Sequence, residues 1–455
     1  MLETDRLTTR PQPTARSAAV LAVSLLVVEL IAACQSYLSS TITPLMAADL
    51  GARDGYGLLA AGTQAAMFLT MPLGAALLSR WPAAVMLTWL TPAIVVGGLV
   101  SAMAPTFALF LAGRVVAALA AGALMTVSLS ALATSLPDQW RRLTLAGYAT
   151  VWLVASLVGP VYAGWAAQVI GWRWALVAYL PVFLAARAVV ILRLREMDRA
   201  EHADRERLAL GPAVLLAAGI TAVSLVGASW ERNLLATAGA VTVVLAAARV
   251  LPTGSLRGAT GRRGLVLLIA VLCGSYFGAH AIVAITGHDL LGRDAGSLAV
   301  LLGAGGVGWA VLGMVCGRWP ARTSAAYVRR VTGGAVLLAG GATSMALAVL
   351  PDTPGDWWWL VGGWTVSGVG MGVCYVDTLN RGLDTPPEPD GLNASQAAQA
   401  LVMAEVIATA LVGTLTASAL AWIVTAMDER AAYAAGVYGL LGLLALTLIP
   451  LARRT

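Results

Sequence analysis

Long apolar runs separated by short polar breaks dominate the sequence. A helix needs about 20 mostly apolar residues to cross a membrane, so each such run bounded by charge, proline or a turn cluster predicts a span. Fourteen runs meet this criterion, which predicts an all-α polytopic membrane protein. The runs cover residues 17–46, 55–79, 82–104, 106–135, 143–169, 174–194, 209–230, 233–250, 264–287, 296–317, 328–350, 357–380, 393–424 and 431–451.

The placement of arginine predicts the direction of these spans. All 29 basic residues are arginines, and the cytoplasmic loops of membrane proteins carry the excess of positive charge. Fourteen spans with a cytoplasmic N-terminus put most of the arginines on the cytoplasmic side, so we expect both termini there. The runs 209–230 and 233–250 are short and alanine-rich. If they form a hairpin that does not cross, twelve spans remain with the same orientation.

Two stretches interrupt the apolar rhythm and divide the chain. Residues 192–208 carry charges of alternating sign, and residues 381–395 form a loop rich in proline and acids. The predicted organisation is a cytoplasmic tail (1–16), an N-terminal six-helix bundle (17–194), a charged linker (195–208), a central two-helix hairpin (209–250), a second linker (251–263) and a C-terminal six-helix bundle (264–452).

The tetrapeptide Arg-Trp-Pro-Ala occurs twice, beginning at Arg80 and at Arg318. Each copy follows the second span of a predicted six-helix bundle, on the cytoplasmic side. Equivalent places in two halves indicate an internal duplication, which is a common construction of secondary transporters.

Composition excludes several classes of protein. With 59% hydrophobic and 11% charged residues, the chain has too little polar surface for a soluble protein. The sequence has no phosphate-binding loop, no metal-ligand cluster and no nucleophile with its base, so we expect no enzyme activity, no metal and no cofactor. Nucleic acid is not an expected partner. A secondary transporter, the class that the duplicated halves indicate, is expected to interact with a small-molecule substrate, protons and the lipid bilayer, here as a monomer of the cell membrane.

The four cysteines lie far apart inside apolar runs, which favours small packing residues over a metal site. The residues before Cys34 resemble a lipoprotein cleavage site. Glu29 interrupts that apolar run, so we expect no cleavage.

Ionisable groups inside predicted spans are candidates for function, because a charge in hydrocarbon costs several kcal/mol. Glu29 lies near the middle of the first span. On a helical wheel, a stripe of hydroxyls falls within about 40° of it, and such a stripe is expected to line a watery cavity. The alternative is a structural carboxyl bonded to a neighbouring helix. The stripe consists of Ser36, Ser40 and Thr43.

Arg114 lies in the fourth span and keeps its charge, so it needs a carboxylate, carbonyls or water. Glu29 is the expected carboxylate. The pKa of a carboxyl beside a fixed cation depends on the distance between the two groups, so a movement of the helices can change it. A proton-coupled pump requires a group of this kind. The alternative is a static ion pair that joins the first and fourth spans.

Glu405 lies near the middle of the thirteenth span, with Thr409 and Thr416 on the same face. Asp377 lies four residues before Arg381, so a helix-end ion pair is the favoured interpretation. His280 is interpreted as a hydrogen-bonded packing residue.

Three segments resemble the major facilitator superfamily, and specifically its fourteen-span drug:proton antiporters. Residues 159–165, GPVYAGW, are similar to the antiporter motif of span 5 through Gly159, Pro160 and Gly164, with Ala163 in place of a glycine. Residues 171–181 resemble the Gly-Trp-Arg-Trp segment that opens span 6. Residues 113–122 resemble the span 4 motif around a membrane arginine, here Arg114.

Two departures from the family pattern concern charged positions. In the loop after span 2, Ser79 replaces the usual aspartate, and Pro82 and Ala83 replace glycine and arginine. The usual span 1 aspartate is also missing, because residues 38–41 read Leu-Ser-Ser-Thr. The replacement of the loop aspartate by Ser79 puts the family's gating salt bridge in doubt.

The resemblance implies a major facilitator fold and proton-driven export of an amphipathic organic compound, a drug or a metabolite, by alternating access. It also implies a substrate-cation or proton role for Glu405. Two alternatives stay open: an exporter of lipids or hydrophobic metabolites with the same fold, and a membrane receptor or assembly partner that transports nothing.

Overall fold

The structure is a computed structural model that describes residues 15–78, 80–197, 210–257, 260–383, 392 and 394–455. Every regular element within these residues is helical, as the apolar runs predict. Inside hydrocarbon, a helix satisfies its backbone hydrogen bonds internally, so long apolar segments fold this way. We call the side at which the first helix begins the proximal side, and the side at which it ends the distal side.

The N-terminal bundle consists of six long helices and a short distal one. Its members are α1 (Ala15–Asp49), α2 (Tyr56–Leu78), α3 (Ala83–Ala102), α4 (Phe107–Ser135), α5 (Asp138–Val169), α6 (Gly171–Ala175) and α7 (Leu180–Met197), with a 3-10 turn, η1 (Arg53–Gly55), before α2.

The sixth predicted span differs from the structure, because turns at residues 176–179 separate α6 from α7. Pro181 follows these turns, and proline cannot donate the backbone hydrogen bond that a continuous helix needs. On the distal side, the Arg173 guanidinium pairs with Asp49 at the end of α1, and the Trp172 indole donates to the same carboxylate at 3.2 Å. The Gly-Trp-Arg-Trp segment therefore fixes α6 to the distal end of α1.

The central hairpin consists of α8 (Leu210–Val223) and α9 (Trp230–Val250). A Cβ atom on Gly219 would lie 2.8 Å from the Gly239 carbonyl, so the two backbones touch where both helices lack side chains. The hairpin packs against α2 and α14 (Ala394–Ala426), one helix from each bundle. It therefore covers a seam between the bundles.

The fourteen-span count is not confirmed. Thirteen helices of the described chain are long and apolar enough to cross a membrane. The exception is α8, of which the structure describes 14 residues; these extend about 21 Å at 1.5 Å per residue, less than the hydrocarbon thickness of about 30 Å.

The C-terminal bundle repeats the plan of the first. Its members are α10 (Gly261–Ile285), α11 (Ala295–Arg318), α12 (Ser324–Ala348), α13 (Asp356–Leu383), α14, α15 (Arg430–Leu446) and α16 (Leu448–Ala452). A π-helical turn, η3 (Thr286–Leu290), extends α10 on the distal side, and a 3-10 turn, η2 (Ser255–Arg257), precedes it.

The two copies of Arg-Trp-Pro-Ala follow α2 and α11, the second long helices of the two bundles. Both lie on the proximal side, where Trp81 and Trp319 are exposed. This placement agrees with the internal duplication that the repeat predicts.

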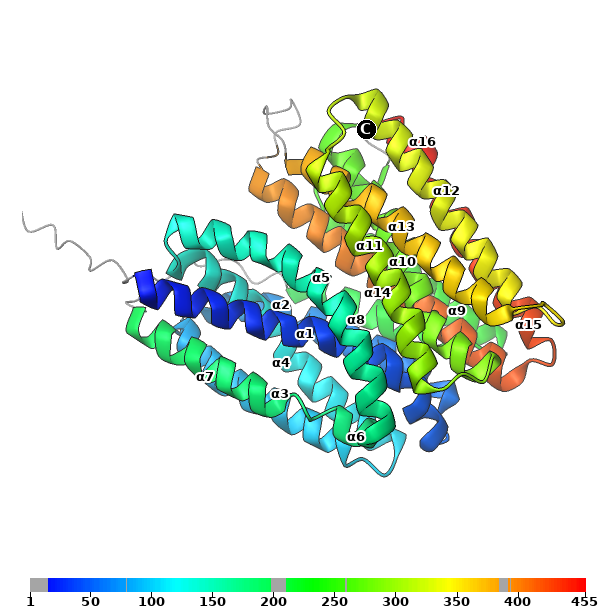
Figure 1. Ribbon diagram of the computed structural model, residues 1–455, viewed down its shortest axis with the longest axis horizontal. Helices are drawn as coiled ribbons and strands as arrows, with labels where there is room; N and C mark the ends of the chain where they lie inside the picture. The colour runs from blue at the N-terminus through cyan, green and yellow to red at the C-terminus, as the bar shows by residue number, and fades with distance from the viewer. Residues whose placement is uncertain (1–14, 79, 198–209, 258–259, 384–391, 393) are drawn as a thin grey trace, which may run out of the picture.

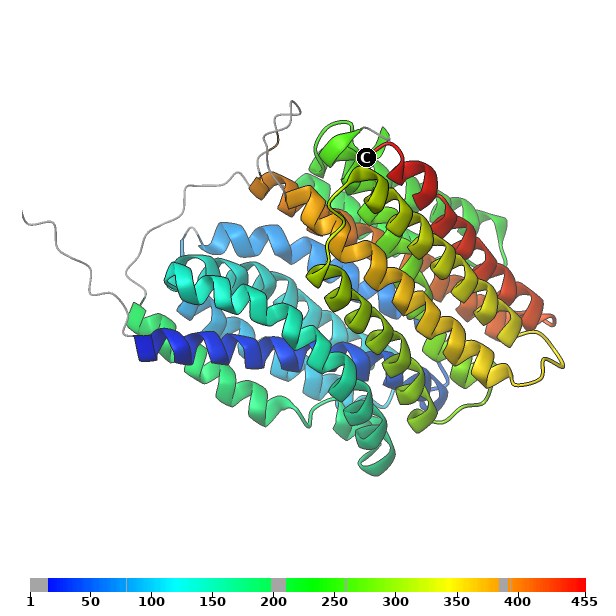
Figure 2. The same ribbon diagram turned by 45° about the horizontal axis from the view of Figure 1, so that its top comes forward.

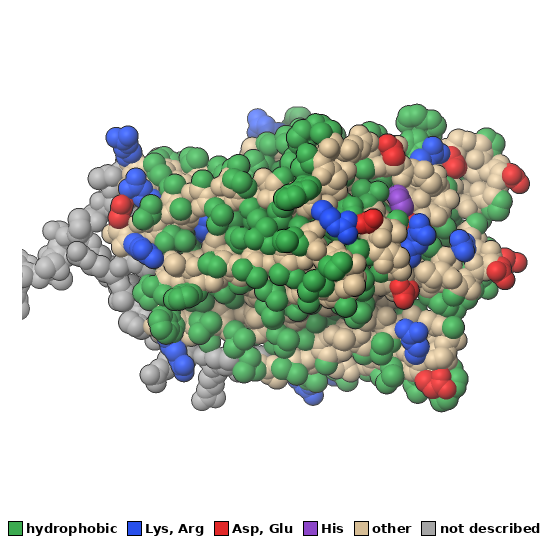
Figure 3. Space-filling view, turned by 90° about the horizontal axis from the view of Figure 1, so that it is seen from below, with side chains coloured by type: hydrophobic (Ala, Val, Ile, Leu, Met, Phe, Trp, Pro, Cys, Tyr) green, Lys and Arg blue, Asp and Glu red, His purple; other side chains and the backbone are tan. Residues whose placement is uncertain are grey.

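The two bundles lie side by side at an angle, and they diverge towards the proximal side (Figure 1). The same divergence is seen after a turn of 45° (Figure 2). From below, hydrophobic side chains cover the middle of the face and charged side chains gather towards its two ends (Figure 3). That distribution is the one expected of helices that cross a bilayer.

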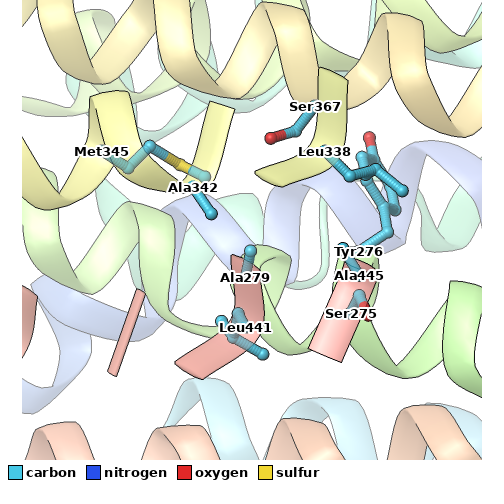
Figure 4. A pocket seen from close by; sticks show the side chains of 9 residues that line it. All are labelled: Ser275, Tyr276, Ala279, Leu338, Ala342, Met345, Ser367, Leu441 and Ala445. Atoms are coloured by element: carbon cyan, nitrogen blue, oxygen red, sulfur yellow. The ribbon is translucent and has the colours of Figure 1, made fainter. Parts of the chain in front are cut away.

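The interior of the C-terminal bundle is tightly packed. A cavity of about 10 Å³ lies between α10, α12, α13 and α15, beside Ser275, Met345 and Ser367 (Figure 4). It has room for one water molecule at most. The cavity is therefore too small for an organic molecule.

Candidate functional site

The most extensive contact between the two bundles joins α5 to α11. A Cβ atom on Gly164 would lie 2.6 Å from the Ala299 Cβ, and one on Gly303 would lie 3.3 Å from the Pro160 Cβ. Because these residues are four apart on each helix, they form one ridge per helix. A Cβ on Gly159 would lie 2.9 Å from the Tyr37 ring of α1. The segment that resembles the antiporter motif therefore lies where α5 meets both α1 and the other bundle.

Polar bonds close the distal side across the two bundles. The Asp289 carboxylate of η3, whose side chain is 1% exposed, accepts from Arg53 Nε at 3.1 Å and from the Tyr56 hydroxyl at 2.7 Å. His288 Nδ1 lies 2.8 Å from the same carboxylate. Arg53 and Tyr56 belong to the N-terminal bundle, so Asp289 connects the two bundles.

A second distal bond joins the Gln168 amide of α5 to Asp294 at 3.0 Å. Asp294 also caps α11, because it accepts from the Ser297 N–H at 3.0 Å. Hydrogen bonds from the Ser297 side chain and backbone hold the pKa of Asp294 below its usual range. The carboxylate is therefore ionised at neutral pH and can accept from both groups.

In the described residues, side-chain hydrogen bonds between the bundles occur at the level of Ser40 and further towards the distal side. Together with the proximal divergence of the helices, this shows a state that is closed distally.

Glu29 lies near the middle of α1 and is partly exposed. The Trp152 indole of α5 lies beside its carboxyl group. The hydroxyls of the predicted stripe donate to carbonyls of their own helix at 2.9 Å for Ser36, 3.1 Å for Ser40 and 2.7 Å for Thr43. Serine and threonine commonly satisfy their hydroxyl protons in this way.

The expected ion pair between Glu29 and Arg114 is not formed. Arg114 Nη2 donates instead to Ser39 Oγ at 3.4 Å. Ser39 is ten residues beyond Glu29 on α1, which is about 15 Å at 1.5 Å per residue. The sequence-based prediction placed Arg114 at the depth of Glu29, whereas the guanidinium lies in the distal half of the bundle.

Glu405 on α14 is partly exposed and accepts from the Tyr375 hydroxyl of α13 at 2.8 Å. The hydroxyl of Thr409 is buried without a partner among the described atoms. The hydroxyl of Thr416 is buried and donates to the Gly278 carbonyl of α10 at 2.9 Å. Thr416 therefore joins two helices of the C-terminal bundle.

Aromatic rings form a cluster between Glu405 and α1 that hydropathy does not predict. Tyr375 packs edge-on against Trp309, which packs in the same way against Tyr276 and Phe277. His280 lies against Phe277, and its Nε2 is 3.1 Å from the Ser40 hydroxyl. The interpretation of His280 as a hydrogen-bonded packing residue is confirmed. The only sequence signal for the cluster was aromatic residues recurring on α10 and α13.

The loop after α11 has a polar anchor. Asp377, buried on α13, accepts from Arg330 Nη1 at 2.7 Å and from the Ala321 N–H at 3.2 Å, and Arg330 also donates to the Trp319 carbonyl. The expected pair of Asp377 with Arg381 is therefore wrong. Arg381 donates instead to the Ser324 hydroxyl at 3.0 Å.

Arg80 and Arg318 are both exposed on the proximal side. Ser79, where the family's loop motif has aspartate, lies outside the described residues. No cluster of His, Cys, Asp or Glu with the arrangement of a metal site occurs in the described part of the chain.

Known efflux pumps resemble part of this chain. It is 23% identical over 197 residues to the efflux pump apf11 of Gibberella fujikuroi, an alignment that covers 43% of this chain and 35% of that protein. It is 23% identical over 171 residues to the multidrug efflux pump SdrM of Staphylococcus aureus, covering 37% of this chain and 38% of that protein. Each alignment thus spans little more than a third of the relative.

Solved structures share the fold over almost the whole chain. An auto-inhibited peptide transporter of the POT family has a TM-score of 0.66 at 14% identity, covering 97% of both chains. The human organic anion transporter MFSD10 has a TM-score of 0.59 at 16% identity, covering 97% of this chain and 100% of that one. At these identities the likeness concerns the fold alone.

The sequence matches the Major Facilitator Superfamily over residues 25–388, which is well over half of the chain. The helices, the duplicated bundles and the structural neighbours agree with this match. The chain is a multi-pass membrane protein that belongs to the Major Facilitator Superfamily of transporters.

Proposed function

We propose that the protein exports an amphipathic organic compound in exchange for protons by alternating access. The observation that carries the proposal is the half-closed arrangement of the two bundles. They meet through a glycine-lined contact and polar bonds on the distal side, and they diverge on the proximal side. Two duplicated bundles that rock about a contact of this kind can expose a central site to each side in turn.

Export is the direction that the relatives' names support, because both aligned bacterial and fungal proteins are called efflux pumps. The excess of arginine on the proximal side supports a cytoplasmic location for that side. In this proposal, the structure is the inward-facing state of a protein of the cell membrane. The two bundles are the moving units, and the α8–α9 hairpin covers the seam between α2 and α14.

Glu29 and Glu405 are the proposed proton carriers. Both are partly exposed; the neutral Trp152 indole lies beside Glu29, and the neutral Tyr375 hydroxyl donates to Glu405. Among the described residues, neither carboxylate pairs with an arginine. Each can therefore bind and release a proton without breaking an ion pair, as a coupling site must do on every cycle.

The test is transport in liposomes that contain the purified protein. Three fluorescent compounds with the same ring system serve as probes: 1-pyrenebutyrate, 1-pyrenebutanol and 1-pyrenebutylamine. An imposed pH gradient should drive uphill movement of at least one probe. Glu29→Gln or Glu405→Gln should abolish accumulation, because a glutamine cannot exchange a proton, while probe binding persists.

Glu231→Gln is the matched control, because Glu231 is exposed at the start of α9. It should accumulate probe as the parent does. Proton release on probe binding, measured in detergent, assigns the coupling site: the variant that no longer releases protons identifies it. Uphill movement that persists in both variants would contradict the assignment, and an absence of movement with every probe would contradict transport of this compound class.

A further inference from the structure

Arg114 is a permanent cation inside the N-terminal bundle without an acidic partner in the described structure. Its described hydrogen bond, to the Ser39 hydroxyl, is long at 3.4 Å. A guanidinium has five N–H donors, so most of them are left for other acceptors. The guanidinium lies inside the bundle, where a donor without an acceptor is costly.

The acids nearest along α1 cannot supply the missing charge. Glu29 and Asp49 each lie ten residues from Ser39, one towards each end of α1, or about 15 Å along the axis. Asp49 is already paired with Arg173. Asp289, on the distal side, is bound by Arg53 and Tyr56.

A second donor lies at the same level of α1, from the other bundle. The Ser40 hydroxyl donates to the Ser36 carbonyl at 3.1 Å. His280 Nε2 lies 3.1 Å from the same hydroxyl, and while the single Ser40 proton is given to the Ser36 carbonyl, the hydroxyl oxygen accepts from the tautomer protonated at Nε2. Consecutive serines of α1 thus accept from Arg114 on one side and from His280 on the other. This layer is rich in donors and contains no carboxylate among its described residues.

We propose that Arg114 binds the carboxylate of the transported compound, which makes the substrate an amphipathic organic acid. The inference rests on the proposed function and names its substrate class. A cation without a counter-charge inside a membrane protein is costly, and a ligand carboxylate supplies both the charge and a planar pair of acceptors that matches a guanidinium. The partly exposed rings of Phe277 and Trp309, beside His280, offer an apolar surface for the rest of the molecule.

The experiment measures binding of the three pyrene probes to the full-length protein in detergent, by fluorescence anisotropy in a chloride-free buffer. The carboxylate should bind at least tenfold more tightly than the alcohol or the amine. Arg114→Gln should remove this preference through a loss of roughly 10- to 100-fold in carboxylate affinity, the range for a charge-assisted hydrogen bond. Arg114→Lys should retain part of it, since lysine keeps the charge but not the paired geometry.

Arg232→Gln is the control, because Arg232 is exposed near the start of α9, and it should leave the preference unchanged. Since Arg114→Gln could misfold, binding of the alcohol by that variant reports whether the site is intact. Equal affinity for all three probes, or a carboxylate preference that survives Arg114→Gln, would overturn the inference.

The transport assay in liposomes distinguishes a failure of this inference from a failure of the proposed function. If the pH gradient drives the alcohol or the amine and not the carboxylate, the inference fails while proton-driven export stands. If the carboxylate binds through Arg114 but no probe moves, the inference holds and the proposed export fails.

Discussion

At the scale of single residues, the partners of buried charges are set by tertiary packing rather than by sequence distance. Asp377 and Arg381 have the i,i+4 spacing of a helical ion pair, yet Asp377 binds Arg330 of α12 and the Ala321 N–H. Its side chain is 3% exposed and that of Arg330 is 30% exposed. Burial favours a partner that also satisfies the loop backbone, because an isolated surface pair contributes little.

We expect Asp377→Asn to destabilise the protein by about 1–3 kcal/mol, because it leaves Arg330 without its counter-charge and weakens the bond to the loop. Thermal unfolding of the purified protein measures the change. Asp352→Asn is the control, since Asp352 is exposed with φ of 56°, a conformation that asparagine tolerates. Equal melting temperatures for the two variants would rule out an anchoring role for Asp377.

Hydropathy identified Glu29, Arg114 and Glu405, because a charge inside an apolar run is visible in the sequence. It could not identify their partners. Arg114 is only the eighth residue of α4, which starts distally, so it meets Ser39 and not Glu29. The Tyr375–Glu405 bond needs two helices placed side by side, and no periodicity within one helix contains that information.

At the scale of elements, apolar runs and polar breaks predict most helices to within a few residues. The exceptions are local interruptions: the turns at residues 176–179, the early end of α8 at Val223, the π-helical turn η3 and the turn at Thr447 between α15 and α16. These features depend on how neighbouring helices satisfy the backbone, which composition does not record. Glycine positions predict close contacts, but the partner helix becomes known only from the structure.

The contact between α5 and α11 should control distal closure. Gly164→Val places a branched side chain where even a Cβ would lie 2.6 Å from Ala299, and overpacking of this kind costs about 1–3 kcal/mol. The strain is relieved when the bundles separate distally, so the distal-open state should gain population. Spin labels at Met103→Cys and Trp358→Cys, both exposed distally, report the separation in a background without native cysteines.

Gly340→Val is the matched control, because a Cβ on Gly340 of α12 would meet nothing within 4 Å. The change from glycine to valine has the same effect on helix propensity at both positions, but at Gly340 it leaves the contact between the bundles unchanged. If the two variants give the same distance distribution, the α5–α11 contact does not govern closure.

At the scale of the whole molecule, the repeated tetrapeptide predicts two bundles but not their relative tilt. Tilt depends on contacts that form in one state and break in another, and a single sequence encodes both states. The structure adds this information through Asp289, which bonds residues of the opposite bundle on the distal side. Few polar bonds join the bundles in the described residues, so each should contribute measurably to the balance of states.

Asp289→Asn should therefore shift the protein towards the distal-open state. Asparagine keeps the size of the side chain and an acceptor for Tyr56, but it loses the ionic bond to Arg53. The Arg53 side chain is 47% exposed, so water offsets part of the loss. About 1 kcal/mol remains, a roughly fivefold change in the ratio of states. The distal label pair at residues 103 and 358 should report more of the long distance, and a proximal pair at Trp81→Cys and Trp319→Cys more of the short one.

Asp356→Asn is the control, since Asp356 pairs at 3.0 Å with Arg293 of its own bundle and its loss should leave both distributions unchanged. If Asp289→Asn behaves like this control, the closed distal side is held by helix packing between the bundles and not by the ionic bond.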